Sequence, residues 1–158
     1  MGFLRRTWRI RATSGGFDIN LPAEERELLT HLLPQLRELL ANPDDERSRR
    51  LFPTAYALDP EFDAEYQRFM RDELATSRTA SLDRFLETAQ AKRVDEATLI
   101  GWMQSINAVR LVLGTLLDVG EEMDPAEMSP KDPRYSEFAL YGYLSGLLYE
   151  IVEALGDG

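Results

Sequence analysis

The sequence predicts a mainly α-helical, single-domain bundle with a short two-stranded β-hairpin at its N-terminus. Apolar residues recur at helical spacing in several long stretches, whereas alternation of apolar and polar residues is confined to the first 21 positions. The chain has 158 residues and no cysteine, and a chain of this length can bury enough surface to fold without disulfides or a structural metal. We therefore treat residues 1–158 as one domain, with the hairpin over about 7–21 and the helical bundle over about 22–155.

The predicted hairpin rests on two short alternating segments joined by a turn. Trp8 and Ile10 alternate with arginines, residues 14–16 (Ser-Gly-Gly) supply the turn, and Phe17 and Ile19 alternate with polar residues. An isolated hairpin is only marginally stable in water. We therefore expect its apolar face to lie on the helices that follow.

The first helix is expected to begin near Asn20 or Leu21, with Pro22 in its first turn, where the missing N–H removes no helical hydrogen bond. Leucines then recur at helical spacing between positions 28 and 40. Pro34 interrupts this stripe, and a proline inside a helix costs about 3 kcal/mol. We expect either a kink about one turn before Pro34 or two shorter helices.

A loop and a second helical region are predicted next. In the loop between Asn42 and Asp59, the apolar segment from Leu51 to Tyr56 is expected to pack over the core. The helical region runs from Pro60 to about Ala91, as one helix or two. Aspartate is a favoured N-cap residue and proline suits the first helical position, so Asp59 and Pro60 together predict where this region begins.

A third helix is predicted from Glu96 to about Val119, after a short Lys92-Arg93-Val94 connection and an Asp95 cap. It is apolar on nearly all sides, which is typical of the central helix of a bundle. Arg110 is its one charge between residues 97 and 117, and a central arginine is costly in lipid, so we predict a buried core helix and no membrane span. The residues expected to be buried in the bundle are Trp102, Ile106, Leu113 and Leu144.

The last helix is predicted from about Pro133 to Leu155. Gly142 and Gly146 lie four residues apart, so both fall on one face of this helix. Two glycines on one face allow another helix to approach closely. We expect this close packing within the bundle, with a dimer interface as the alternative.

The charge of the chain argues against direct DNA binding. The 18 basic and 28 acidic residues give a net charge of -10, which repels phosphates. Four arginines nevertheless crowd the first eleven residues, which contain no acid. This basic arm either contacts a partner or docks on the acidic body of its own chain, and its candidate partner-binding residues are Trp8, Arg9 and Arg11. Because Arg9 and Arg11 interrupt any apolar stretch after Arg5 and Arg6, we predict no export signal and a cytoplasmic protein.

The sequence contains no convincing catalytic constellation, and we predict a protein that is not an enzyme and needs no cofactor. His31 is the only histidine, and it lies within a leucine-rich stripe. No phosphate-binding loop, dinucleotide-binding glycine motif or nucleophile elbow is present. The acidic residues between positions 121 and 132 lack the spacing of a calcium-binding loop, which favours a solvated loop and no metal site.

One polar group stands out on the third predicted helix. Asn107 and Arg110 are three residues apart and share a face, and Gln104 lies one turn before Asn107. A buried guanidinium must be paired and hydrogen-bonded. Two interpretations follow: Arg110 pairs with an acid such as Glu150 or Asp118, or the face binds an anion or another ligand.

Four short motifs follow one another along nearly the whole chain. They are Leu51-Phe52-Pro53-Thr54-Ala55-Tyr56, Asp59-Pro60 with Glu65-Tyr66-x-Arg68-Phe69, Trp102-x-x-x-Ile106-Asn107-x-x-Arg110-Leu111-x-Leu113-Gly114-Thr115, and Tyr141-Gly142-Tyr143-Leu144. Together they resemble the actinobacterial oxidative stress regulator AosR family. The resemblance implies a cytoplasmic regulator that binds a sigma factor of the extracytoplasmic-function class and raises transcription of cysteine-biosynthesis genes under oxidant.

In that family a Cys-x-x-x-Cys pair forms the sensing disulfide, but this chain has no cysteine that could take its place. Two functions from different classes therefore remain open. The first is a non-enzymatic, transcription-associated regulator of the oxidative stress response that contacts a sigma factor or RNA polymerase, as a monomer or weak homodimer. The second is a small-molecule or anion-binding domain that uses the face formed by Asn107 and Arg110.

Overall fold

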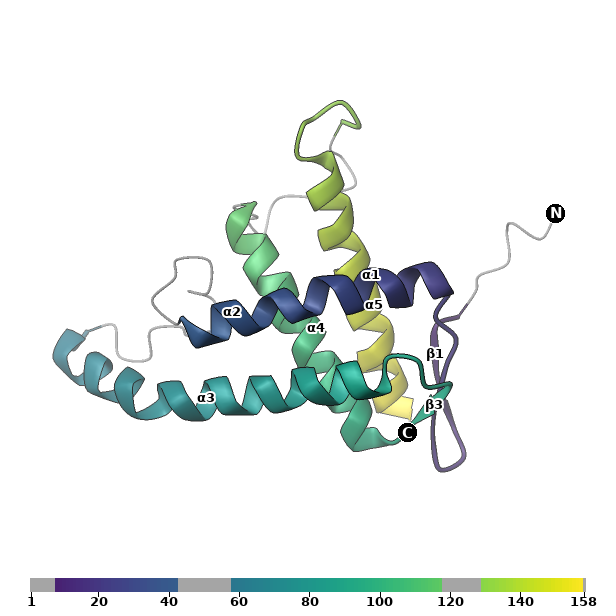
Figure 1. The fold of residues 1–158 in the computed structure, drawn as a ribbon, viewed down its shortest axis with the longest axis horizontal. Helices are drawn as coiled ribbons and strands as arrows, with labels where there is room; N and C mark the ends of the chain where they lie inside the picture. Colours follow the sequence, from purple (N-terminus) through teal and green to yellow (C-terminus); the bar gives the residue numbers. More distant parts are fainter. Residues whose placement is uncertain (1–7, 43–57, 118–128, 158) are drawn as a thin grey trace.

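The computed structural model describes residues 8–42, 58–117 and 129–157. This part of the chain is mainly helical, with a small antiparallel sheet near the N-terminus, so the predicted fold class is confirmed (Figure 1). The elements in chain order are β1 (Ile10–Thr13), β2 (Gly16–Ile19), α1 (Ala23–Leu32), the 3₁₀ helix η2 (Leu33–Gln35), α2 (Leu36–Ala41), α3 (Pro60–Thr88), β3 (Arg93–Val94), α4 (Glu96–Leu116) and α5 (Tyr135–Asp157).

The sheet contains one strand more than the predicted hairpin. β1 and β2 pair antiparallel, with Ile10 opposite Ile19 and Thr13 opposite Gly16. Gly16, which was predicted to belong to the turn, is therefore the first residue of β2, and Gly15 takes the left-handed conformation in the turn, at a φ of 80°. β3 then pairs antiparallel with the other side of β2. The segment around Arg93 was predicted as a plain connection, and the structure corrects this. A two-residue strand is too short to show any alternation in the sequence.

The core lies where the sheet meets the helices. Ile10, Phe17 and Ile19 are buried, which confirms that the apolar face of the hairpin packs on the bundle. α4 contacts α3, α5, β2 and η2, so its predicted central place is also confirmed (Figure 1). Of the four residues expected in the core, Trp102, Ile106 and Leu144 are fully buried. Leu113 is only partly buried, because it lines an open groove beside α2.

Local sequence signals set the helix boundaries. The helix that contains Pro34 is divided into α1 and α2 by η2, which confirms the prediction of two shorter helices. Pro22 lies at the N-cap of α1, one residue before the first turn in which we expected it. Asp59 and Asp95 cap α3 and α4, and their carboxylates accept hydrogen bonds from the backbone N–H of Phe62 at 3.1 Å and of Thr98 at 2.8 Å. α3 is one continuous helix of 29 residues.

Gly142 and Gly146 of α5 contradict the expectation of close packing within the bundle. Gly142 and Gly146 are exposed, and a Cβ atom added at either would meet no described atom within 4 Å. Tyr149 and Val152 are also exposed on this helix. The alternative of a dimer interface on this face stays a prediction. The apolar segment from Leu51 to Tyr56 lies outside the described residues.

α4 and α5 are both long and apolar enough to cross a membrane by length and composition alone. In α4, half of the most apolar window is buried inside the fold, as expected for a core helix. In α5, 28% of that window is buried. The membrane prediction therefore rests on the sequence argument about Arg110.

Candidate functional site

Arg9, one of the three predicted partner-binding residues, is engaged inside the fold. Its Nε donates to Oε1 of Glu25 at 2.7 Å, and its Nη2 donates to Oε2 at 3.1 Å. The hydroxyl of Tyr143 in α5 donates to the same Oε1 at 2.5 Å. The Arg9 guanidinium also lies 5.9 Å from the centre of the Tyr143 ring. This cluster joins the start of the hairpin to α1 and α5.

The cluster changes the pKa of its members. Burial alone would raise the pKa of Glu25, but the hydrogen bonds from Arg9 and Tyr143 outweigh burial and lower this pKa below its ordinary value. The hydrogen bond to Glu25 raises the pKa of Arg9. Burial, followed by the nearby carboxylate, raises the pKa of Tyr143. Glu25 is therefore ionised in the folded protein at neutral pH.

A depressed folded-state pKa makes stability depend on pH. The contribution of Glu25 is present above its unfolded pKa of about 4.3 and is lost as the pH falls through the lower folded value. Glu25→Gln is expected to lower the free energy of unfolding by about 1–2 kcal/mol at pH 7 and to flatten the loss of stability below about pH 4.3. Urea unfolding between pH 7 and pH 3 measures both effects. Glu24→Gln, at an exposed position one residue earlier, is the control, and an identical pH profile for the two variants would contradict the prediction.

Glu150 was predicted as a partner of Arg110, and this prediction is wrong. Its Oε1 accepts the backbone N–H of Arg9 at 2.5 Å and that of Ile10 at 3.1 Å. These contacts satisfy N–H groups at the outer edge of β1, where no further strand pairs among the residues that the structure describes. Glu150 thus fixes the sheet to α5 and is not available to the third predicted helix.

Trp8 and Arg11, the other two predicted contact residues, form a pair at the surface, which we call the hairpin patch. The Arg11 guanidinium lies 4.1 Å from the centre of the Trp8 ring, and the Arg11 side chain is exposed. Trp8 also lines an open pocket of about 740 Å³ between the hairpin, the start of α1 and the segment after α3. Asp18 lies opposite Arg11 in the register of β1 and β2, but its carboxylate forms an ion pair with Arg93 of β3 at 2.7 Å.

Arg26 is a buried cation that the sequence analysis missed. Its guanidinium is held by backbone carbonyls and by no carboxylate in the described part of the chain: Leu21 O at 3.1 Å, Ala89 O at 2.5 Å, Ala91 O at 3.0 Å and Ile19 O at 3.4 Å. Two of these carbonyls follow the last residue of α3, where the helix dipole is negative. Burial lowers the pKa of Arg26. An arginine in an acid-rich helical segment gives no sequence signal for such a role.

Arg110 has neutral partners. Its Nε and Nη2 donate to Oδ1 of Asn107 at 3.4 and 3.2 Å, and its Nη1 donates to the hydroxyl of Tyr141 at 3.2 Å. The guanidinium also lies 5.6 Å from the centre of the Tyr141 ring. Asp118, the other acid predicted to pair with Arg110, lies outside the described residues. The two members of the predicted polar face therefore contact each other directly.

The third member of that face, Gln104, contacts α3. Its Oε1 lies 2.6 Å from the hydroxyl of Ser81. Gln104 and Asn107 line the same surface pocket of about 230 Å³ between α3 and α4, which we call the seam pocket. The remaining lining residues are Ser77, Arg78, Ala108 and Leu111. The structure thus joins Asn107 to Arg110 by hydrogen bonds and places Asn107 with Gln104 in one pocket, together with residues from α3; Arg110 does not line this pocket.

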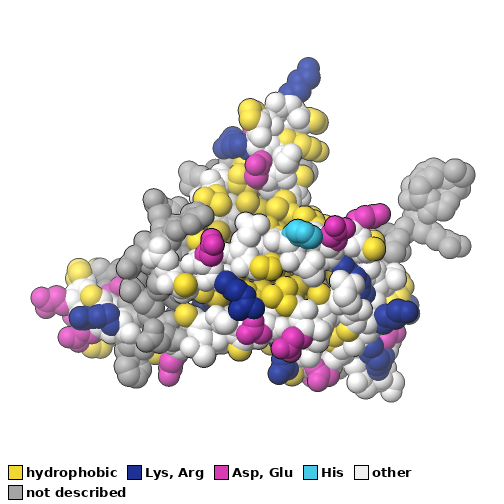
Figure 2. All heavy atoms as spheres, viewed as in Figure 1, with side chains coloured by type: hydrophobic (Ala, Val, Ile, Leu, Met, Phe, Trp, Pro, Cys, Tyr) yellow, Lys and Arg dark blue, Asp and Glu magenta, His cyan; other side chains and the backbone are white. Residues whose placement is uncertain are grey.

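An apolar groove lies on another side of α4. Leucine and valine side chains of the first helices and of α4 enclose about 180 Å³, with Gln35 and Glu38 as polar members. Figure 2 shows hydrophobic side chains gathered on this face of the molecule, along α1 and α2 and the part of α4 behind them. The apolar lining residues are Leu32, Leu36, Leu39, Val109, Val112, Leu113 and Leu116.

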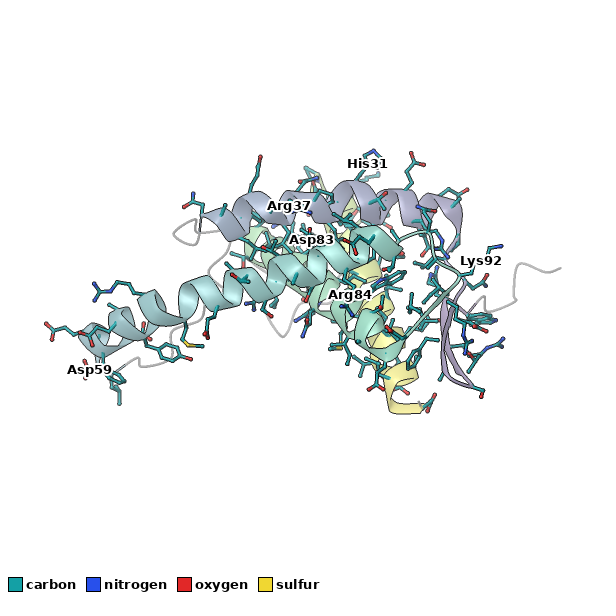
Figure 3. All side chains as sticks on the ribbon, turned by 60° about the horizontal axis from the view of Figure 1, so that its bottom comes forward. His31, Arg37, Asp59, Asp83, Arg84 and Lys92 are labelled. Carbon is teal, nitrogen blue, oxygen red and sulfur yellow. The ribbon has the colours of Figure 1, made fainter. Side chains whose placement is uncertain are left out.

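No metal site is formed by the described histidine, aspartate and glutamate residues, since no three of them are grouped suitably. Figure 3 shows His31 on the outer face of α1, and its ring Nδ1 lies 2.9 Å from the backbone oxygen of Glu27. Arg37 of α2 forms an ion pair with Asp83 of α3 in the same view. His31 is therefore a surface residue.

These features define a mainly helical domain in which buried polar contacts fasten a small N-terminal sheet to a helical core. A family model described as a domain of unknown function, DUF2017, matches residues 5–155, and the chain belongs to this family. Comparisons with curated proteins and with solved structures found no match.

Proposed function

We propose that this DUF2017 domain is a non-enzymatic, transcription-associated regulator of the oxidative stress response that acts by protein–protein contact. The proposed partner is a sigma factor of the extracytoplasmic-function class or RNA polymerase, as the resemblance to the AosR family implies. The proposal places the protein in the cytoplasm, as a monomer or weak homodimer without a cofactor, direct DNA contact or membrane insertion.

The hairpin patch is the observation that carries this proposal. Tryptophan and arginine are the side chains most enriched among residues that dominate binding energy in protein interfaces. Trp8 and Arg11 stack on one another at the surface, so little side-chain freedom remains to be lost on binding. The patch is a local positive charge on a chain of net charge -10, which favours an acidic contact surface on the partner.

Trp8→Ala combined with Arg11→Glu tests the patch. We expect this variant to bind the purified sigma factor at least about tenfold more weakly, since one aromatic anchor is lost and one charge is reversed. Arg9 is left unchanged, because Arg9→Glu would break the contact with Glu25 and disturb the fold. Isothermal titration calorimetry measures the affinity, and circular dichroism checks the helical content.

Arg68→Glu is the matched control, because it reverses one exposed charge in the first third of α3. The start of α3 lies at the opposite end of the molecule from the hairpin (Figure 1). If the patch variant binds as tightly as the wild type, the hairpin patch is not the contact surface. Leu116→Glu then tests the apolar groove as the contact surface instead. Absence of any binding by the wild-type protein would contradict the proposed function itself.

The same binding titration, repeated after treatment with peroxide, tests whether oxidation changes the affinity. With no cysteine, the chain cannot form the disulfide of the AosR-type switch, so mild peroxide is expected to leave the affinity unchanged. Methionine is then the only sulfur-containing residue; Met123 and Met128 are the expected sites of oxidation and lie outside the described residues. An affinity change that Met123→Leu with Met128→Leu abolishes would show a methionine-based switch instead.

A further inference from the structure

We propose that the seam pocket between α3 and α4 binds a small oxyanion, a phosphate or carboxylate group, through the side-chain amide of Asn107. This inference is independent of the proposed protein contact, which concerns the hairpin at a different place in the fold. It rests on three observations: the orientation of the Asn107 amide, the second amide at the pocket wall, and the position of Arg110 beside Asn107.

Arg110 fixes the orientation of the Asn107 amide. A guanidinium can only donate hydrogen bonds, so the atom that meets its Nε and Nη2 must be the amide oxygen. The two hydrogens on Nδ2 consequently point away from Arg110. Neither of them has a hydrogen-bond partner within the part of the chain that the structure describes. Asn107 is half-buried and lines the pocket, so these donors are available to a ligand there.

Gln104 adds a further donor to the same wall. Ser81 Oγ lies 2.6 Å from one terminal atom of the Gln104 amide and 3.1 Å from the backbone oxygen of Ser77. The Gln104 amide carries two N–H donors on its nitrogen, and the Ser81 hydroxyl contacts only one terminal atom of this amide. Whichever atom that is, at least one N–H of Gln104 has no partner among the described residues. Gln104 is exposed at the mouth of the pocket.

Two arginines lie at or beside the pocket, and the described partners of one of them, Arg110, are neutral. Arg78 is the one charged side chain that lines the pocket in the described part of the chain, and Arg110 lies behind Asn107. Arg78 is half-buried, and this burial lowers its pKa. Electrostatic attraction is stronger in such a place than at an open surface. Ser77 adds a hydroxyl, and Leu111 and Ala108 add an apolar side.

The size of the pocket suits one anionic group with a short organic extension. Its volume of about 230 Å³ is well above the roughly 10–15 Å³ that one water molecule needs on the same measure. Hydrogen-bond donors along one wall match the oxygens of phosphate and carboxylate groups, which accept hydrogen bonds. The common chemistry of these groups defines the proposed ligand class, and the two probes below distinguish them.

Asn107→Asp is the decisive variant. The new carboxylate keeps an oxygen that accepts from Arg110, so the fold is retained, but it replaces the amide donors by a negative charge. Inorganic phosphate, acetate and chloride are titrated in parallel at constant ionic strength, with backbone amide shifts of residues 104–111 as the readout. We expect saturable shifts with phosphate or acetate in the wild type, and at least tenfold weaker binding in Asn107→Asp.

Gln90→Glu is the control for net charge, because it makes the same change at an exposed position that does not line the pocket. It is expected to bind as the wild type does. Gln104→Glu is a second variant. Because Gln104 is exposed, this substitution is expected to leave the fold intact and to weaken binding of the anion. Equal shifts with chloride, no saturation in the wild type, or unchanged binding in Asn107→Asp would each overturn the proposal.

Discussion

Arg26→Ala is expected to lower the free energy of unfolding by about 3 kcal/mol or more. The guanidinium is 9% exposed and donates to carbonyls that belong to three segments: the end of β2, the residue before the N-cap of α1, and the chain after α3. Its removal leaves these buried carbonyls without donors. The loss corresponds to a melting temperature lower by roughly 6–12 °C, at 2–4 °C per kcal/mol for a chain of this size.

Arg26→Lys separates charge from geometry. A lysine keeps the positive charge near the end of α3, but it cannot reproduce the planar fork that reaches several carbonyls at once. We expect it to recover less than half of the lost stability. Arg37→Ala, which removes an exposed ion pair with Asp83, is the control and should change stability by less than about 1 kcal/mol. Equal effects of Arg26→Ala and Arg37→Ala in urea unfolding would refute the assigned role.

Trp102→Ala is expected to cost about 3–5 kcal/mol, the range for removal of a large buried aromatic side chain. Trp102 is completely buried and packs edge to face against Phe85, with 4.9 Å between ring centroids. Its indole N–H donates to the hydroxyl of Thr88 at 2.8 Å. These contacts join α4 to the C-terminal half of α3, so the substitution leaves a cavity at the main helix–helix contact of the domain.

Trp102→Phe is the companion variant. It keeps an aromatic ring against Phe85 and gives up only the indole hydrogen bond and part of the volume. We expect a loss of about 1–2 kcal/mol, clearly smaller than for alanine. Chemical denaturation followed by circular dichroism measures both. Similar losses for phenylalanine and alanine would show that the hydrogen bond, and not packing, is the dominant contribution of Trp102.

Much of the helical architecture could be predicted because its causes are local. The caps at Asp59 and Asp95, the break at Pro34 and the apolar periodicity of α4 all act over three or four residues along the chain. The same range explains why the shared helix face of Asn107 and Arg110 could be predicted from their spacing, whereas the hydrogen bonds between them were seen only in the structure.

The candidate sites depended more strongly on the tertiary structure. The sequence predicted that Arg9 and Arg11 share one arm, but the fold separates their roles: Arg9 binds Glu25 in α1, whereas Arg11 stays at the surface against Trp8. Gly142 and Gly146 were correctly placed on one helix face, yet only packing decided that this face is exposed. Helical periodicity shows which residues lie on the same face of a helix, but it does not show which neighbouring element covers that face.

By itself, then, the sequence determined the fold class, the helix limits set by caps and prolines, and the shared face of Gln104, Asn107 and Arg110. The tertiary structure alone decided that β3 joins the sheet, that Glu150 serves the edge of β1, and that Arg26 binds carbonyls more than sixty residues away in the chain. The reason is physical. Caps and periodicity depend on neighbours within one helical turn, whereas a carbonyl acceptor is present in every residue, so no sequence pattern marks which one a distant side chain will meet.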